Sequence, residues 1–130
     1  MRYLGIDYGT KKIGLALSDE EGRLAFPHLV IPSGNSIDIS IELKKMIEDE
    51  NVNAVVIGES LDFKGEENIV AKKARALARA LEDTGLPVHF EPEFLSSVQA
   101  KRSTEDAKAD AAAAAIVLQT FLDKRANLKT

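Results

Sequence analysis

The sequence predicts an α/β fold built on a mixed five-stranded sheet, and three features lead to this prediction. Residues 12–18 alternate between large apolar and small or polar side chains, which is the period-two pattern of a strand. Residues 52–58 form a short, nearly continuous apolar run, as expected of a strand buried on both faces. The segments follow one another as three strands and then alternating helices and strands. This order predicts three antiparallel strands and then two parallel strands, flanked by helices.

The elements can be placed along the chain from local signals. Residues 2–8 and 12–18 are joined at Gly9-Thr10, and Pro27 makes the start of the third strand irregular. Ser36 is expected to cap the first helix, and Gly85 is expected to end the second. The later elements are a third strand over about 26–31, a helix over about 37–50, a strand over 52–58, a helix over about 66–84, a strand over 88–91 and a helix over about 106–125.

The composition predicts a single cytoplasmic domain spanning residues 1–130. A chain of 130 residues has the usual size of one domain. No apolar run approaches the ~18 residues of a membrane span, and the opening MRYLGIDYGT lacks the pattern of a signal peptide. With no cysteine and two histidines, thiolate zinc sites and histidine-rich metal sites are excluded. Any metal is therefore expected to be a hard cation with oxygen ligands.

The charge is unevenly distributed. The net charge of −4 argues against non-specific binding to nucleic acid over the whole surface. Residues 64–79, however, hold five basic residues against two glutamates. Within this segment Lys72, Arg75 and Arg79 recur at helical spacing on one face, so this face could meet phosphate groups. The alternative is an ordinary solvated helix face.

Asp7 lies inside an apolar strand, in the string GIDYGTKKIG. Burying an unpaired carboxylate is costly, so an aspartate at this position indicates a functional role. Alternation places it on the same strand face as Gly5, where a missing side chain lets another element or a ligand approach. The alternative is an aspartate that caps its own turn. The string alone fits both the polynucleotidyl-transferases and the actin-like kinases and ATPases.

Three further acidic residues could join Asp7. Glu91 and Glu93 follow a strand at its carboxyl end, where open α/β sheets build sites, although glutamates there can also be merely solvated. Asp110 opens an alanine-rich helix, and the helix dipole alone would favour an acid in that first turn. The small alanines would also let the helix approach the sheet and bring Asp110 towards Asp7. Three carboxylates from separate elements can hold two Mg²⁺ ions about 3.5–4 Å apart.

Taken together, these segments resemble the YqgF family, also called RuvX-like Holliday-junction resolvases and regarded as nucleases that process the small-subunit ribosomal RNA precursor. GIDYGTKKIGLALSD matches the opening motif of the family, and DAAAAAIVLQTFLD matches its final helix. VVIGESLDFKGEENIVAKKARALARAL resembles its central loop and basic helix, and FLSSVQA resembles the segment after its Asp-Glu-Arg motif. The resemblance extends over essentially the whole chain. It implies a ribonuclease-H-like fold and a phosphodiester nuclease that depends on Mg²⁺ or Mn²⁺.

The resemblance also implies the site residues. Asp7, Glu93 and Asp110 correspond to the catalytic and metal-binding acids, and Ser96 and Ser97 stand where the family has hydroxyl residues. The residues expected to hold the phosphodiester backbone are Lys11, Lys12, Lys72, Arg75 and Arg79. The chain departs from the family where Pro92-Glu93-Phe94 replaces Asp-Glu-Arg and where the stretch before Asp110 is shorter than usual. These departures leave Glu91 as an alternative to Glu93.

The substrate and the oligomeric state remain open between alternatives. From the resemblance, structured RNA is expected first, as the 16S rRNA precursor in ribosome biogenesis, and branched DNA in recombination and repair second. Both a monomer and a homodimer are compatible with the sequence. A non-catalytic nucleic-acid-binding module is a third possibility. An actin-like nucleotide-binding protein is disfavoured, because such proteins clamp nucleotide between two folds of this kind and the chain supplies one.

Overall fold

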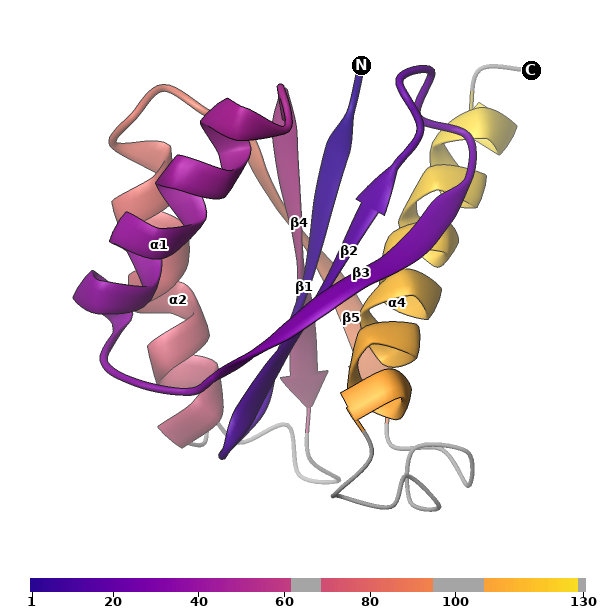
Figure 1. Cartoon of the computed structure of the whole chain (residues 1–130). Helices are drawn as coiled ribbons and strands as arrows, with labels where there is room; N and C mark the ends of the chain where they lie inside the picture. The colour runs from indigo at the N-terminus through magenta and orange to yellow at the C-terminus, as the bar shows by residue number, and fades with distance from the viewer. Residues whose placement is uncertain (62–68, 95–106, 129–130) are drawn as a thin grey trace.

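The computed structural model describes residues 1–61, 69–94 and 107–128 (Figure 1). The elements in these ranges are β1 (Tyr3–Tyr8), β2 (Lys12–Ser18), β3 (Ala25–Pro32), α1 (Ser36–Asp49), β4 (Ala54–Leu61), α2 (Ile69–Glu82), β5 (Val88–Phe94) and α4 (Ala107–Leu128). This order confirms the predicted succession of three strands followed by alternating helices and strands. Within the described ranges, no helix is long and apolar enough to span a membrane.

The strands form one mixed sheet in the order β3-β2-β1-β4-β5. β2 pairs antiparallel with β1 and with β3, whereas β4 pairs parallel with β1 and with β5. The predicted arrangement of three antiparallel and two parallel strands is therefore confirmed. Figure 1 views the sheet nearly edge-on, with α1 and α2 against one face and α4 against the other. The edge strands are β3 and β5.

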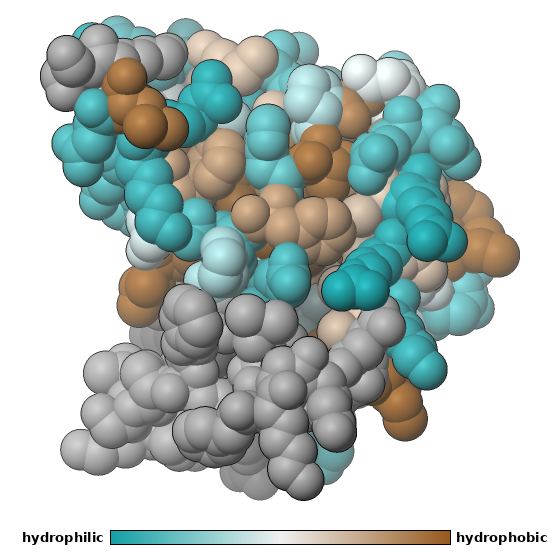
Figure 2. All heavy atoms as spheres, turned by 180° about the vertical axis from the view of Figure 1, so that it is seen from behind, coloured by the Kyte–Doolittle hydropathy of each residue, from teal (hydrophilic) through white to brown (hydrophobic). Residues whose placement is uncertain are grey.

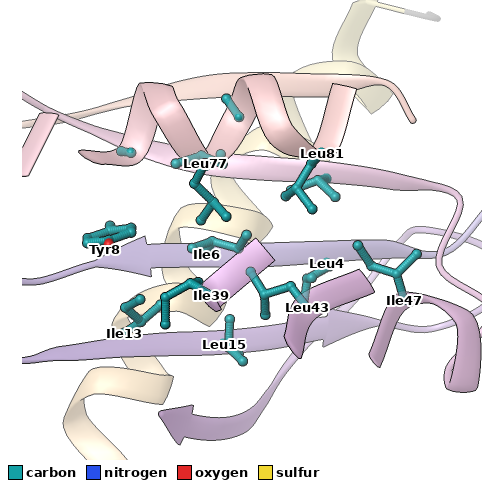
Figure 3. Close-up of a cluster of buried hydrophobic side chains, with 14 of the residues drawn as sticks. Leu4, Ile6, Tyr8, Ile13, Leu15, Ile39, Leu43, Ile47, Leu77 and Leu81 are labelled. Atoms are coloured by element: carbon teal, nitrogen blue, oxygen red, sulfur yellow. The ribbon is translucent and has the colours of Figure 1, made fainter. Parts of the chain in front are cut away.

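The larger apolar core lies between the sheet and the α1–α2 layer. Strand alternation directs Leu4 and Ile6 of β1 towards this layer, together with Ile13 and Leu15 of β2. Figure 3 shows these side chains facing those of α1 and α2. The helix residues that complete this core are Ile39, Leu43, Ile47, Ala74, Leu77, Ala78 and Leu81. Each helix contributes them at three- and four-residue spacing, as the sequence pattern predicted.

The opposite face carries small residues, and these let α4 pack closely against the sheet. A Cβ atom on Gly5 would lie 2.8 Å from Leu118 Cβ and 3.2 Å from the carbonyl oxygen of Ala114. A side chain at position 5 would therefore push the helix away. On the helix side, Ala114 and Leu118 are fully buried in the contact. The alanine-rich sequence of α4 thus brings its backbone next to the middle of β1.

Several element boundaries differ from the predicted ones. The N-cap of α1 is Asn35, whose side chain accepts a hydrogen bond from Asp38 N at 2.8 Å, while Ser36 Oγ donates to the carbonyl oxygen of Lys73 instead. The prediction of Ser36 as the cap was wrong by one residue. β5 also continues through Pro92 to Phe94, beyond the predicted end at Glu91. The first residues of the helix predicted over 66–84 lie outside the described ranges, and α2 ends at Glu82.

Candidate active site

Asp7 lies near the carboxyl end of β1, directly opposite Gly14 of β2. Directly paired residues on antiparallel strands have Cα atoms about 4.5–5.5 Å apart. Because side chains alternate along a strand, Asp7 shares the face of Gly5, which is the face that α4 covers. Its side chain is neither fully buried nor fully exposed. The carboxylate is therefore on the helix-covered face and near the end of the strand, as the sequence predicted.

Asp110 is brought to the same place by the start of α4. A Cβ atom on Gly14 would overlap the carbonyl oxygen of Asp110, so the first turns of the helix rest directly on the backbone of β2. Gly14 is also the pairing partner of Asp7. The two aspartates therefore come from elements about a hundred residues apart in sequence and meet around one glycine. Figure 1 shows α4 beginning at the end of the sheet where β1 and β4 finish.

The Asp110 side chain has an unusual environment. Its Oδ2 atom is buried and has no hydrogen-bond partner among the described residues. A buried carboxylate oxygen is stabilised by hydrogen-bond donors or positive charge, so this atom can accept a hydrogen bond or bind a cation. Carboxylate oxygens are the preferred ligands of hard divalent cations. The Asp7 and Asp110 pair therefore fits part of a Mg²⁺ or Mn²⁺ site.

Glu91 forms an ion pair with Lys124 of α4. Its side chain is only 5% exposed, and its Oε2 accepts a hydrogen bond at 2.6 Å from Lys124 Nζ on α4. Lys124 is fourteen residues beyond Asp110 in the same helix, a separation of about 21 Å at 1.5 Å per residue. A carboxylate held by Lys124 therefore lies near the far end of α4. Next to this contact, the His89 ring packs 5.0 Å from the Phe121 ring, and burial together with Arg125 lowers the pKa of His89.

Glu93 is the other predicted acid, and its backbone belongs to β5. It pairs in register with Ser60 of β4, two residues beyond the pair formed by Gly58 and Glu91. Glu93 therefore lies closer than Glu91 to the carboxyl end of the parallel strands. Its side chain is outside the described part of the structure, as are Ser96 and Ser97. Among the side chains that are described, no three acidic or histidine residues gather into a metal site.

The predicted phosphate-binding residues fall into two groups. Lys11 and Lys12 lie at the turn between β1 and β2, and alternation puts Lys12 on the same face as Gly14. Lys72, Arg75 and Arg79 are exposed on α2, which packs on the opposite side of the sheet from α4. The first group is next to the two aspartates. The second group lies in the other helix layer, so a nucleic acid touching both groups must pass around an edge of the sheet.

Two residues with roles in the packing or charge pairing of α4 were not identified as such from the sequence. Gly14 sets how closely α4 approaches, and a glycine inside an alternating strand is the signal that could have indicated this role. Lys124 neutralises Glu91, but an isolated lysine near the end of a long helix gives no such signal in the sequence. Gln119 of α4 donates to the carbonyl oxygen of Arg23 and accepts from Ala25 N, so it fastens the helix to the start of β3.

Comparisons with known proteins identify relatives over nearly the whole chain. The sequence profile of a family described as "RuvX: Holliday junction resolvase" matches residues 1–124. A protein of Maridesulfovibrio salexigens named "Putative pre-16S rRNA nuclease" is 36% identical over 132 residues, which cover 94% of this chain and 98% of that protein. The match spans nearly the full length of both proteins, so it includes the β1, β5 and α4 segments discussed above.

Solved structures confirm the fold. RuvC of T. thermophilus in complex with a Holliday junction superposes with a TM-score of 0.61 at 17% identity, over 96% of this chain and 95% of that chain. A ROK family protein from Streptococcus pneumoniae TIGR4 superposes with a TM-score of 0.52 over 71% of this chain but only 34% of that chain. The likeness to the RuvC chain is thus nearly complete, which confirms the predicted ribonuclease-H-like fold. With a family profile over residues 1–124 and a relative 36% identical over nearly its full length, the chain belongs to the RuvX family.

Proposed function

We propose that this protein is a metal-dependent nuclease that cuts structured RNA, with the 16S rRNA precursor as its substrate in ribosome biogenesis. Asp7, Glu93 and Asp110 are the acids that hold the metal in this proposal. The observation that carries it is the meeting of Asp7 and Asp110 around Gly14, with Asp110 Oδ2 buried and lacking a hydrogen-bond partner among the described residues. The names of the relatives at about 36% identity supply the reaction class and the substrate.

The donor set at this end of the sheet supports Mg²⁺ or Mn²⁺ as the cofactor. A pair of such ions supplies an activated water and stabilises the leaving oxygen of a phosphodiester. Asp7 on β1, Glu93 on β5 and Asp110 on α4 would hold the ions. Lys12, on the face of Gly14, would attract the phosphate that approaches the two aspartates.

The choice of Glu93 over Glu91 rests on charge pairing and on the family motif. Glu91 is paired with Lys124 of α4, so a cation at Glu91 would have to displace this lysine. Glu93 lies two residues further along β5, towards the carboxyl end of the parallel strands, and corresponds to the acid of the family's Asp-Glu-Arg motif. The whole chain would act as one catalytic domain in the cytoplasm, where precursor rRNA is made and processed.

A DNA nuclease that resolves Holliday junctions is the second candidate. The description of the family profile and the junction bound to the RuvC relative favour it. The same carboxylates would serve either substrate, because phosphodiester hydrolysis does not require the 2′-hydroxyl group. The two candidates therefore differ in which nucleic acid the surrounding surface accepts, and not in the chemistry of the site.

The experiment that tests the proposal is cleavage of 16S rRNA precursor and of a four-way DNA junction by the purified protein, with Mg²⁺, with Mn²⁺ and with EDTA. We expect metal-dependent cleavage of the precursor and a loss of at least about 100-fold in the Asp7→Asn variant, the size expected when a group that acts only in the transition state is removed. Glu91→Gln is the matched control and should keep most of the activity. Undiminished cleavage by Asp7→Asn would remove Asp7 from the mechanism. Binding without cleavage by the wild-type protein would favour the non-catalytic module.

A further inference from the structure

Phe90 is an exposed aromatic residue on the edge strand β5. It pairs in register with Ile57, a member of the core beneath α1 and α2, so its ring lies on the α2 side of the sheet. Even so, 36% of its surface is exposed. Part of its apolar aromatic surface is therefore accessible to a planar group.

The surroundings of Phe90 combine this aromatic surface with positive charge. Phe90 and Arg75 line the same surface hollow between α2 and the β4–β5 pair, with Glu59 as the acidic residue of its lining. Lys72 and Arg79 lie on the same helical face as Arg75 and are also exposed. Figure 2 views the molecule from the β5 side and shows a band of apolar atoms in the middle of this face, with hydrophilic side chains on either side.

Two properties of the β5 edge indicate what kind of molecule it fits. Pro92 is exposed in this edge strand and lacks an N–H donor, which discourages the addition of a further β-strand from another protein. Arg75, which lines the hollow with Phe90, and Lys72 and Arg79 on the same helical face instead complement a polyanion. An exposed aromatic ring next to basic residues is the arrangement by which proteins hold unpaired nucleotides, with bases stacked on the ring and phosphates on the cations.

We infer that a single-stranded segment of the nucleic-acid substrate runs along the β5 edge, stacking an unpaired base on Phe90 while Lys72, Arg75 and Arg79 hold its phosphates. This inference rests on the proposed nuclease function and adds the substrate class: a nucleic acid with an unpaired segment next to the cleavage point. Phe90 is three residues from Glu93 along β5, a separation of about 10 Å at 3.3 Å per residue. Because Phe90 lies on the α2 side and Asp7 and Asp110 lie on the α4 side, a continuous nucleic-acid strand that touches both would pass around the β5 edge.

The test compares binding of two RNA hairpins with the same stem, one blunt and one with a single-stranded tail, measured in EDTA so that no cleavage occurs. Phe90→Leu retains an apolar side chain for packing but removes the aromatic face. We expect it to weaken binding of the tailed hairpin about 5- to 100-fold and to leave the blunt hairpin within about 2-fold, because stacking needs an unpaired base. A 2-aminopurine in the tail should be quenched by the wild-type protein and not by the variant.

Phe26→Leu is the matched control, since Phe26 is 52% exposed on β3, the edge strand at the other side of the sheet. It should leave both affinities unchanged, and thermal melting should show that both variants are folded. Equal affinity of the Phe90→Leu variant and the wild-type protein for the tailed hairpin would overturn the inference. So would sedimentation showing that the wild-type protein is a dimer and the Phe90→Leu variant is a monomer. Tail-dependent binding without metal-dependent cleavage would contradict the proposed nuclease and leave this inference standing.

Discussion

At the scale of single residues, the carboxylates of Asp110 and Glu91 differ in their surroundings. Asp110 has a buried oxygen without a hydrogen-bond partner among the described residues, whereas Glu91 is neutralised by Lys124 at 2.6 Å. A buried charge that is already paired gains little from a cation, and a buried oxygen without a partner gains much. Both acids lie at the interface between α4 and the sheet, but in different environments. Glu91 links β5 to α4 through Lys124, and Asp110 is the acid proposed to bind the metal.

The ion pair between Glu91 and Lys124 should be asymmetric in its effect on stability. Lys124→Met leaves the carboxylate buried without a partner, and we expect it to lower the free energy of unfolding by about 3 kcal/mol. Glu91→Gln leaves Lys124 exposed to water, as it already largely is, and should cost only about 1 kcal/mol. Urea denaturation of both variants checks this prediction. The double variant should be more stable than Lys124→Met alone. Equal costs for the two single variants would show that the pair does not hold the buried charge.

The role of a single residue could be predicted from the sequence where it follows from the neighbouring residues in the chain. Asp7 could be singled out because a carboxylate inside an apolar strand is rare in any fold. The cap of α1 was misplaced because Asn35 and Ser36 are both good capping residues, and the tertiary contact of Ser36 with Lys73 decides between them. The role of Lys124 could not be predicted, because it depends on the angle at which α4 crosses β5.

At the scale of elements, the contact between α4 and β2 places the two aspartates. The helix reaches the sheet because Gly5 and Gly14 have no side chains on its path. Asp110 is in the first turn of this helix, so its position follows from how the start of α4 packs on β2. The loops on either side of the site vary more readily than such a contact does. The distance between the two acids is therefore a property of the packed sheet and helix.

Gly14→Ala tests the close packing of α4 on β2. The added Cβ atom would overlap the Asp110 carbonyl oxygen, and backbone atoms cannot move aside as a flexible side chain could. We expect a cost of about 1–3 kcal/mol in the free energy of unfolding and a loss of metal-dependent cleavage larger than the stability change explains. Gly34→Ala is the matched control, because a Cβ atom there meets nothing within 4 Å. Normal cleavage by a folded Gly14→Ala variant would contradict the account.

Element identities were predicted well from the sequence, and their ends less well. All the strands and helices in the described ranges occur in the predicted order, because apolar periodicity reports burial directly. β5 was predicted too short because Pro92 interrupts the pattern of a strand. Proline is tolerated there because β5 pairs with β4 on one side only and its outer edge needs no N–H donor. Whether a strand is at an edge is a property of the whole sheet.

At the scale of the whole molecule, the acids and the exposed basic residues of α2 lie in different layers. Asp7 and Asp110 lie between the sheet and α4, and the basic residues of α2 lie on the other side of the sheet. In a protein of net charge −4, local clusters of basic residues are what would allow a polyanion to bind. The sheet order could be predicted from the succession of elements. The position of the basic helix α2 relative to the acids could not be predicted, because the succession of elements does not say which helix packs on which face of the sheet.

Neutralising the α2 stripe should change the salt dependence of binding. The triple variant Lys72→Gln, Arg75→Gln and Arg79→Gln removes up to three phosphate contacts. The slope of log affinity against log salt concentration should therefore become shallower by about 2 to 3. Lys44→Gln with Lys45→Gln, on α1, is the control and should leave the slope unchanged. Fluorescence anisotropy at several salt concentrations gives the slopes. An unchanged slope in the triple variant would show that the stripe is only solvated.

The most direct test of the central claim is a titration of Mn²⁺ into the wild-type protein and four single variants, followed by electron paramagnetic resonance. It measures metal binding itself and requires no substrate. We predict that Asp7→Asn, Glu93→Gln and Asp110→Asn each weaken Mn²⁺ binding at least about 10-fold, the size expected when one ligand or its support is lost. Glu91→Gln should bind Mn²⁺ like the wild-type protein. Loss of Mn²⁺ binding in Glu91→Gln together with normal binding in Glu93→Gln would contradict the account.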